Sequence, residues 1–160
     1  MSPGLSRLLA LCAQELTGEF VASDEALELR VYVQRGRVAW ATSSRDRDLF
    51  VRVLRETTRL SEELIEEISE LCLRENRHLG ETLVASRLAT VAQVRTALRA
   101  EIEITLELLE RAGPMRTVFQ PLRSTSTYDD ALTFEPQQLD RLHLEDVVPE
   151  MDAALVAALG

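Results

Sequence analysis

The sequence predicts an α+β fold in which a small antiparallel β-sheet is interrupted by a helical insertion, with helices packed on one face of the sheet. Three observations support this fold class. Apolar residues recur at helical spacing near the N-terminus, alternate with polar residues between positions 27 and 42, and return to helical spacing from position 46 to position 112. A further strand pattern follows at 115–122. Strand patterns on both sides of a helical block favour one sheet over two domains, because each piece alone is too small for a stable core.

The first elements are a helix and a meander of strands. The apolar stripe of the helix recurs every three or four residues and consists of Leu5, Leu8, Leu9, Cys12 and Leu16. Gly18 can end this helix in the left-handed conformation. Residues 19–23 are expected to form the first strand, and residues 27–34 alternate strictly, which is typical of a half-buried strand. Arg35-Gly36 then predicts a turn into a return strand over 37–42.

The helical block is expected to hold several helices. The first of them is predicted over 46–56, and Ser61 begins the next because acidic residues follow this capping residue. A short helix and a tight connection are expected over 79–88. Thr90, with Gln three residues later, is a capping-box pattern for a long helix that can run to Ala112, where Gly-Pro ends it.

The chain is expected to form one domain followed by a tail. Residues 1–135 are assigned to the single domain, with the helical insertion at about 59–112. After the strand at 115–122 we expect a polar loop over 124–130 and a short last strand over 131–135. Residues 136–160 are expected to be a C-terminal tail.

The tail alternates short apolar clusters with acidic residues. Pro149 splits it, and the spacing of Met151, Ala154, Leu155 and Ala158 predicts a final short helix. Apolar residues such as Leu142 favour docking of the tail on the domain. A disordered arm that binds a partner is the alternative.

Composition excludes several classes of function. The formal net charge of -9 and the sequence pI of about 4.8 argue against general binding to nucleic acid or to anionic membranes. No apolar run approaches the roughly 20 residues that span a bilayer, so no membrane span is predicted. Arg7 interrupts the apolar run at the N-terminus early, so we expect a cytoplasmic protein. Cys12 and Cys72 fit apolar helix positions and are expected to be buried, reduced thiols.

Recognisable catalytic motifs are missing from the sequence. It contains no Gly-rich phosphate loop and no Ser or Cys in a nucleophile elbow. His78 and His143 have no His or Cys companion at metal-ligand spacing, and the acidic residues of 62–70 lie on the polar face of an amphipathic helix. We therefore expect a non-enzymatic protein without cofactor or metal.

Two aromatic residues of the strands are candidates for contact with a partner. Trp40 is expected to share a strand face with Val38, and both core packing and an exposed contact are open for it. Tyr32 lies opposite the face of Leu29, Val31 and Val33, so it is expected to be exposed, either in a cross-strand pair or in a partner contact.

Several segments of the chain carry short motifs in a fixed order: 16–20, 29–33, 36–41, 79–84, the helix after Thr90, and 113–121. In order and spacing these segments are similar to the opening helix, the "TG.L.V" strand, the "G.IV.A" strand and the closing Gly and aromatic strand of the PATAN domain. The resemblance covers about residues 5–122. The resemblance implies a domain of bacterial signalling that mediates protein–protein contacts.

Residues 78–101 also resemble the repeat in the N-terminal domain of secretion and pilus assembly ATPases, some of which bind cyclic di-GMP. That repeat starts with Arg-Leu-Gly, has a Gly at its middle turn and ends in Gln. This chain has a single copy, with His78, Arg87 and Glu101 at those three positions. The resemblance therefore implies the packing module with its ligand-facing positions changed.

Three hypotheses of function follow. The favoured one is a non-enzymatic interaction module or adaptor in bacterial intracellular signalling or polarity regulation, with a protein as partner. The alternative is a cyclic di-GMP sensor that uses Arg77, His78 and Arg87 near the turn. The second alternative is a structural subunit that forms a homo-oligomer through the long helix 91–112.

Overall fold

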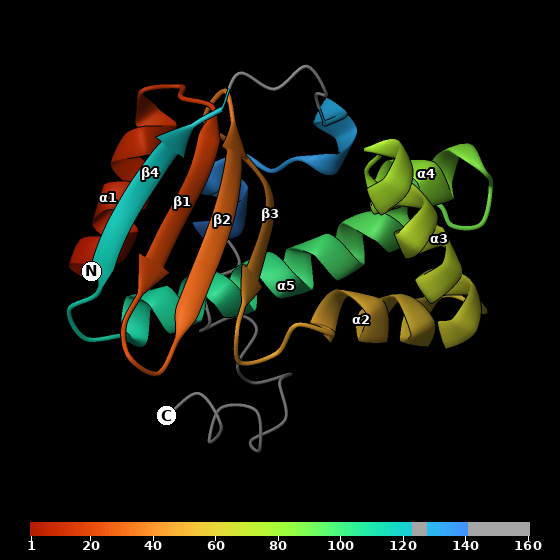
Figure 1. Ribbon diagram of the computed structural model, residues 1–160. Helices are drawn as coiled ribbons and strands as arrows, with labels where there is room; N and C mark the ends of the chain where they lie inside the picture. Colours follow the sequence, from red (N-terminus) through yellow and green to blue (C-terminus); the bar gives the residue numbers. More distant parts are fainter. Residues whose placement is uncertain (123–127, 141–160) are drawn as a thin grey trace.

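The computed structural model describes residues 1–122 and 128–140 and confirms the α+β fold class (Figure 1). In the described residues, one antiparallel sheet has the strand order β3-β2-β1-β4. The strands are β1 Gly18–Ser23, β2 Glu28–Gln34, β3 Arg37–Ser43 and β4 Arg116–Pro121. The helices are α1 Pro3–Ala13, α2 Leu49–Thr57, α3 Glu62–Glu75, α4 Leu79–Ala85, α5 Val91–Arg111, the 3-10 turn η1 Asp130–Leu132 and α6 Pro136–Asp140.

The helical insertion joins the two edges of the sheet. The chain leaves the sheet after β3 and returns as β4, which pairs with β1 so that Phe20 faces Phe119. In Figure 1, α5 crosses behind the sheet, while α2, α3 and α4 extend to the right of β3. The insertion thus forms a second body beside the β3 edge, and α5 connects this body to the sheet.

Two apolar clusters hold these parts together. The main cluster lies between one face of the sheet and α1, α5 and the segment after η1; its largest buried side chains include Phe20, Leu29, Ile102, Leu109 and Phe134. The second cluster lies between the helices of the insertion and η1, and it consists of Leu54, Ile65, Leu83, Ala89, Val94, Ala97 and Leu132. The apolar stripe of α5 contributes residues to both clusters. The apolar side of this helix is therefore packed within the same molecule.

The predicted capping box at the start of α5 is present. The Gln93 amide nitrogen donates to Thr90 Oγ1 at 3.1 Å, and the Thr90 amide nitrogen donates to Gln93 Oε1 at 2.9 Å. The helix predicted over 46–56 is α2, which begins at Leu49 and not at residue 46, and Asp48 occupies its N-cap position.

The predicted strand over 131–135 is wrong. The Asp129 side chain accepts from the Ala131 amide and opens a 3-10 turn, so the strand pattern is broken at its start. Only Phe134 pairs with the sheet, through an isolated bridge in which its amide donates to the Val38 carbonyl at 2.9 Å and its carbonyl accepts from Val38 at 2.8 Å.

The expected shared face of Val38 and Trp40 is also wrong. The register between β2 and β3 shifts at Tyr32/Val33, so Trp40 faces Tyr32 while Val38 faces Val33. An extra residue in one strand moves the following side chains to the other face. Val38 and Ala41 therefore enter the main core, whereas Trp40 points to the opposite face.

The beginning of the expected tail is docked. Residues 136–140 form α6, and Leu139 is buried in the main core. His143, Pro149 and the predicted final helix lie outside the described residues.

Both cysteines are free and buried, as predicted, and burial raises the pKa of Cys12 to about 11. Among the described residues, none of the helices combines the length and the apolar character needed to cross a bilayer.

Replacing Gly36 by alanine is expected to destabilise the protein by at least about 2 kcal/mol. Gly36 has φ of +78°, and a Cβ there would lie 2.3 Å from the Cys12 carbonyl oxygen, so both the backbone and the helix end must shift. Gly113→Ala is the matched control, because a Cβ at Gly113 has no heavy atom within 4 Å. Urea unfolding of both variants measures the difference; equal stabilities would contradict the strained turn.

Candidate functional site

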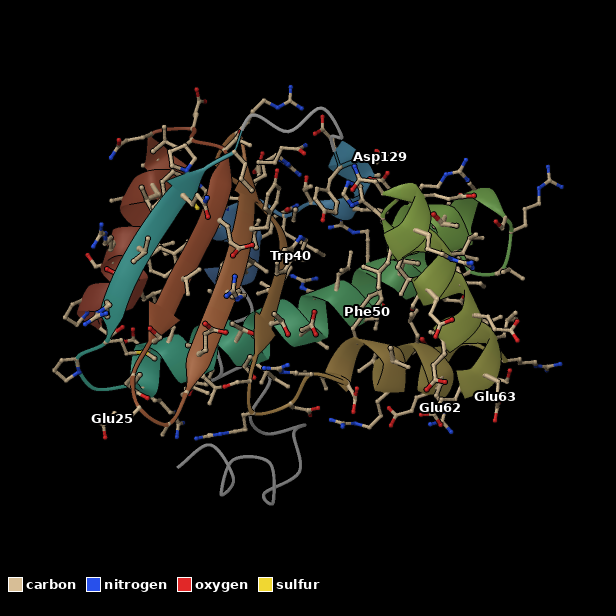
Figure 2. All side chains as sticks on the ribbon, in the orientation of Figure 1. Glu25, Trp40, Phe50, Glu62, Glu63 and Asp129 are labelled. Atoms are coloured by element: carbon tan, nitrogen blue, oxygen red, sulfur yellow. The ribbon has the colours of Figure 1, made fainter. Side chains whose placement is uncertain are left out.

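A pocket of about 380 Å³ lies between the β3 edge of the sheet and the helical insertion. Figure 2 shows Trp40 from β3 and Phe50 from α2, which both border the region where these two bodies face each other. Cys72 and Leu73 of α3, His78, Leu79 and Glu81 around the start of α4, and Leu98 and Glu101 of α5 complete most of its wall. Ala39, Ser69, Arg77, Gly80, Tyr128 and Leu132 line the remainder. The walls are mainly apolar, which is typical of a binding site with few orienting polar groups.

The turn after α3 places two lining residues. Asn76 takes the left-handed conformation with φ of 54°, and the Arg77 amide donates to the Cys72 carbonyl at 2.8 Å, which ends α3. His78 then precedes α4, where the Thr82 hydroxyl donates to the His78 carbonyl at 2.8 Å. The chain reversal directs Arg77 and His78 to the pocket.

An aromatic row consists of Trp40, Tyr32, Tyr128 and His78, of which all but Tyr32 line the pocket. The rings of Trp40 and Tyr32 are stacked with centroids 5.9 Å apart, and Tyr128 contacts Tyr32 at 5.3 Å in a tilted arrangement. Tyr128 also stacks on His78, with centroids 3.6 Å apart. The row connects β2 and β3 to the start of α4. The packing of these rings against one another stabilises the contact between the sheet and the insertion.

The expected exposure of Tyr32 is wrong. Tyr32 is only 5% exposed, because Tyr128 covers the sheet face on which the Tyr32 ring lies. Trp40 is half-buried and lines the pocket, so of the two aromatic candidates only Trp40 belongs to its wall.

A buried glutamine fixes Tyr128. Gln34 is 3% exposed, its Nε2 donates to the Tyr128 carbonyl at 2.9 Å, and its Oε1 accepts from the Tyr128 amide at 2.7 Å. A side-chain amide that pairs with both backbone groups of one residue replaces a strand partner. Burial raises the pKa of Tyr128 well above its usual value, so its hydroxyl stays neutral.

Glu101 is the least exposed acid of the pocket wall. Its side chain belongs to α5, and the residue is 8% exposed. Burial raises the pKa of Glu101 to about 8, the charge of Asp46 adds to this shift, and a hydrogen bond from the Phe50 amide opposes it. At neutral pH the carboxyl group is therefore mostly protonated and able to donate a hydrogen bond.

His78 offers a second polar group. Its Nε2 is buried and has no hydrogen-bond partner in the described structure. Burial lowers the pKa of His78, although the charge of Glu81 opposes this shift, so the ring is neutral near pH 7. A buried ring nitrogen without a partner costs free energy that a bound group can recover.

The three residues considered for cyclic di-GMP binding do not all reach the pocket. Arg77 and His78 line it, whereas Arg87 is absent from the lining and lies in the turn after α4, with φ of 59°. Arg77 is 65% exposed at its side chain and pairs with Glu75 at 3.2 Å.

The groups that line the pocket are suited to binding. Within residues 1–122 and 128–140, no group of three or more His, Cys, Asp or Glu side chains is arranged to hold a metal ion. The pocket has apolar walls and a carboxyl group that can donate or accept a hydrogen bond.

Comparison of the chain with protein-family models, with curated proteins and with solved structures found no match. The resemblance to PATAN domains and to the ATPase repeat therefore stays a prediction.

Sequence reasoning singled out only part of this site. Glu101 follows Ala97 by four residues and Leu98 by three, so helical spacing alone places it on the apolar stripe of α5 and could have indicated a buried acid. Gln34 and Tyr128 carry no comparable local signal, because they are 94 residues apart and are brought together by the fold.

Proposed function

We propose that the protein is a non-enzymatic interaction module, an adaptor in bacterial intracellular signalling, whose pocket receives an extended side chain with an apolar body from a protein partner. The observation that carries this proposal is Leu73, which lines the pocket and is nevertheless 83% exposed. The signalling context rests on the resemblance of about residues 5–122 to PATAN domains.

A protein partner accounts for the exposure of Leu73 better than a small ligand. Leu73 leaves apolar area in water, whereas the preceding residue, Cys72, is buried. A small molecule inside the pocket leaves this outer surface uncovered. A polypeptide segment covers it while one side chain fills the pocket, which is the usual anatomy of an interface anchor.

The test is a selection of displayed peptides on the purified protein, followed by affinity measurement of synthetic copies. Ser69→Phe places a ring in the pocket from α3, and we expect it to weaken peptide binding at least about tenfold, equivalent to about 1.4 kcal/mol. Glu67→Phe is the matched control, since Glu67 is exposed on the side of the same helix that faces away from Ser69 and Leu73 and is expected to leave affinity unchanged.

Two further outcomes decide the proposal. Leu73→Glu is expected to abolish binding, whereas Val118→Glu, at an apolar residue of β4 that is 52% exposed, is expected to have no effect. Selection of no peptide, or of peptides equally sensitive to Val118→Glu and Leu73→Glu, would overturn the assignment of this pocket as the partner site.

A further inference from the structure

The charges around the pocket favour a cation. Two of its lining residues are acids: Glu81, and Glu101, which becomes negative when its carboxyl group loses its proton. The cationic lining residue Arg77 is already paired with Glu75 at 3.2 Å. His78 is neutral near pH 7 because burial lowers its pKa. The formal net charge of -9 adds a general attraction for cations. These charges do not favour an anionic occupant.

One aromatic ring in the wall favours the same occupant. Trp40 lines the pocket and stacks on Tyr32 through one face, and an ammonium group over the other face of the indole is attracted by the ring quadrupole. The chain already uses this interaction elsewhere, since the Arg95 guanidinium lies 4.3 Å from the centroid of the Phe134 ring.

The apolar walls require a long aliphatic body. Leu73, Leu79 and Leu98 line the pocket, so a charged group that reaches Glu101 must bring methylene groups that pack on these leucines. A lysine side chain has this build, with four methylene groups and a compact ammonium at the end. A single buried carboxyl group suits one compact ammonium better than the two-pronged guanidinium of arginine.

Resting on the proposed function, we infer that the partner side chain is a lysine, whose stem lies along the leucines of the pocket and whose ammonium forms an ion pair with Glu101. The occupant is thus a lysine-containing segment of a protein. The bound ammonium requires the Glu101 carboxylate, so binding breaks the carboxyl O–H bond, and the proton leaves to solvent. The lysine ammonium keeps all three of its protons.

The loss of the Glu101 proton on binding makes the affinity for the lysine ammonium dependent on pH. As pH rises toward and past the Glu101 pKa of about 8, less work is needed to remove the proton, and affinity for the ammonium increases. Cys72, Arg77, His78, Glu81 and Tyr128 are titratable or charged groups that share the pocket wall with Glu101. The charge of Asp46, which is itself paired with Arg52, also acts on Glu101.

The test uses two probes on the full chain, N-acetyl-lysine N-methylamide and N-acetyl-norleucine N-methylamide, followed by NMR titration. They share the aliphatic stem and differ in the ammonium. We expect the lysine probe to bind about tenfold more tightly at pH 8, because a charge-assisted hydrogen bond adds to the packing of the stem. We expect this ratio to increase between pH 6 and pH 9, while the norleucine probe stays unchanged.

Variants separate this inference from the proposed function. Glu101→Gln is expected to reduce the ratio to about one without weakening the norleucine probe, and Glu103→Gln, at a residue of the same helix outside the pocket wall, is expected to keep it. Equal affinity of the two probes in the unaltered protein overturns the lysine assignment. If selected peptides still depend on Leu73, the proposed function stands while the lysine assignment fails.

Discussion

Replacing Phe134 by alanine is expected to destabilise the protein by about 3–5 kcal/mol. Phe134 is fully buried in the main core, where its backbone pairs with Val38 and its ring lies under the Arg95 guanidinium. The substitution leaves a cavity between the sheet and α5 and removes the ring contact with Arg95. It thereby tests whether the segment after η1 completes the domain.

Chemical unfolding followed by circular dichroism measures this loss. Leu122→Ala is the control, because Leu122 also lies late in the chain but is 36% exposed, and its truncation is expected to cost less than about 1 kcal/mol. A loss of less than about 1 kcal/mol for Phe134→Ala would show that the domain core forms without this segment.

Replacing Glu101 by glutamine is expected to flatten the dependence of stability on pH. The pKa of Glu101 is about 8 in the folded protein, against an ordinary value of 4.5. Between these two values the folded state holds a proton that the unfolded state has released, so the free energy of unfolding falls as pH rises. One such group contributes a slope of about 1.4 kcal/mol per pH unit, which reaches at most about 4–5 kcal/mol over the whole interval.

Urea unfolding at pH 5, 6, 7 and 8 gives the slope for each protein. We expect Glu101→Gln to lose up to about 1.4 kcal/mol per pH unit of the wild-type slope and to be the more stable protein at pH 8. Glu66→Gln, on the exposed face of α3, is expected to follow the wild type. Parallel curves for Glu101→Gln and the wild type would mean that Glu101 is solvated in the folded protein.

The local pattern of the sequence predicted most elements of the fold. Alternation over 27–34 predicted β2, and the capping box at Thr90 predicted the start of α5. These signals are local, because strand alternation and helix caps depend on residues within a few positions of each other. The same local pattern misassigned 131–135 as a strand, since a single Asx turn at Asp129 outweighed it.

Local sequence patterns predicted little of the candidate site. Leu73 and Leu79 are recognisable only as apolar helix residues, and nothing in their spacing shows that they line one pocket with Trp40. The prediction that Tyr32 is exposed was wrong, because Tyr128 covers the Tyr32 ring. Tyr128 comes from a distant part of the chain and is held in place by Gln34. Such contacts join residues far apart in sequence, and periodicity carries no information about them.

The sequence by itself determined most of the helices and strands, with the exception of 131–135, as well as the interruption of the sheet and the burial of both cysteines. The tertiary structure alone decided that β4 joins β1, that a register shift separates Val38 from Trp40, and that Glu101 lies in a pocket wall. The physical reason is that secondary structure follows from short-range backbone and side-chain preferences. The surroundings of a buried carboxyl, and hence its pKa, depend on every element packed around it.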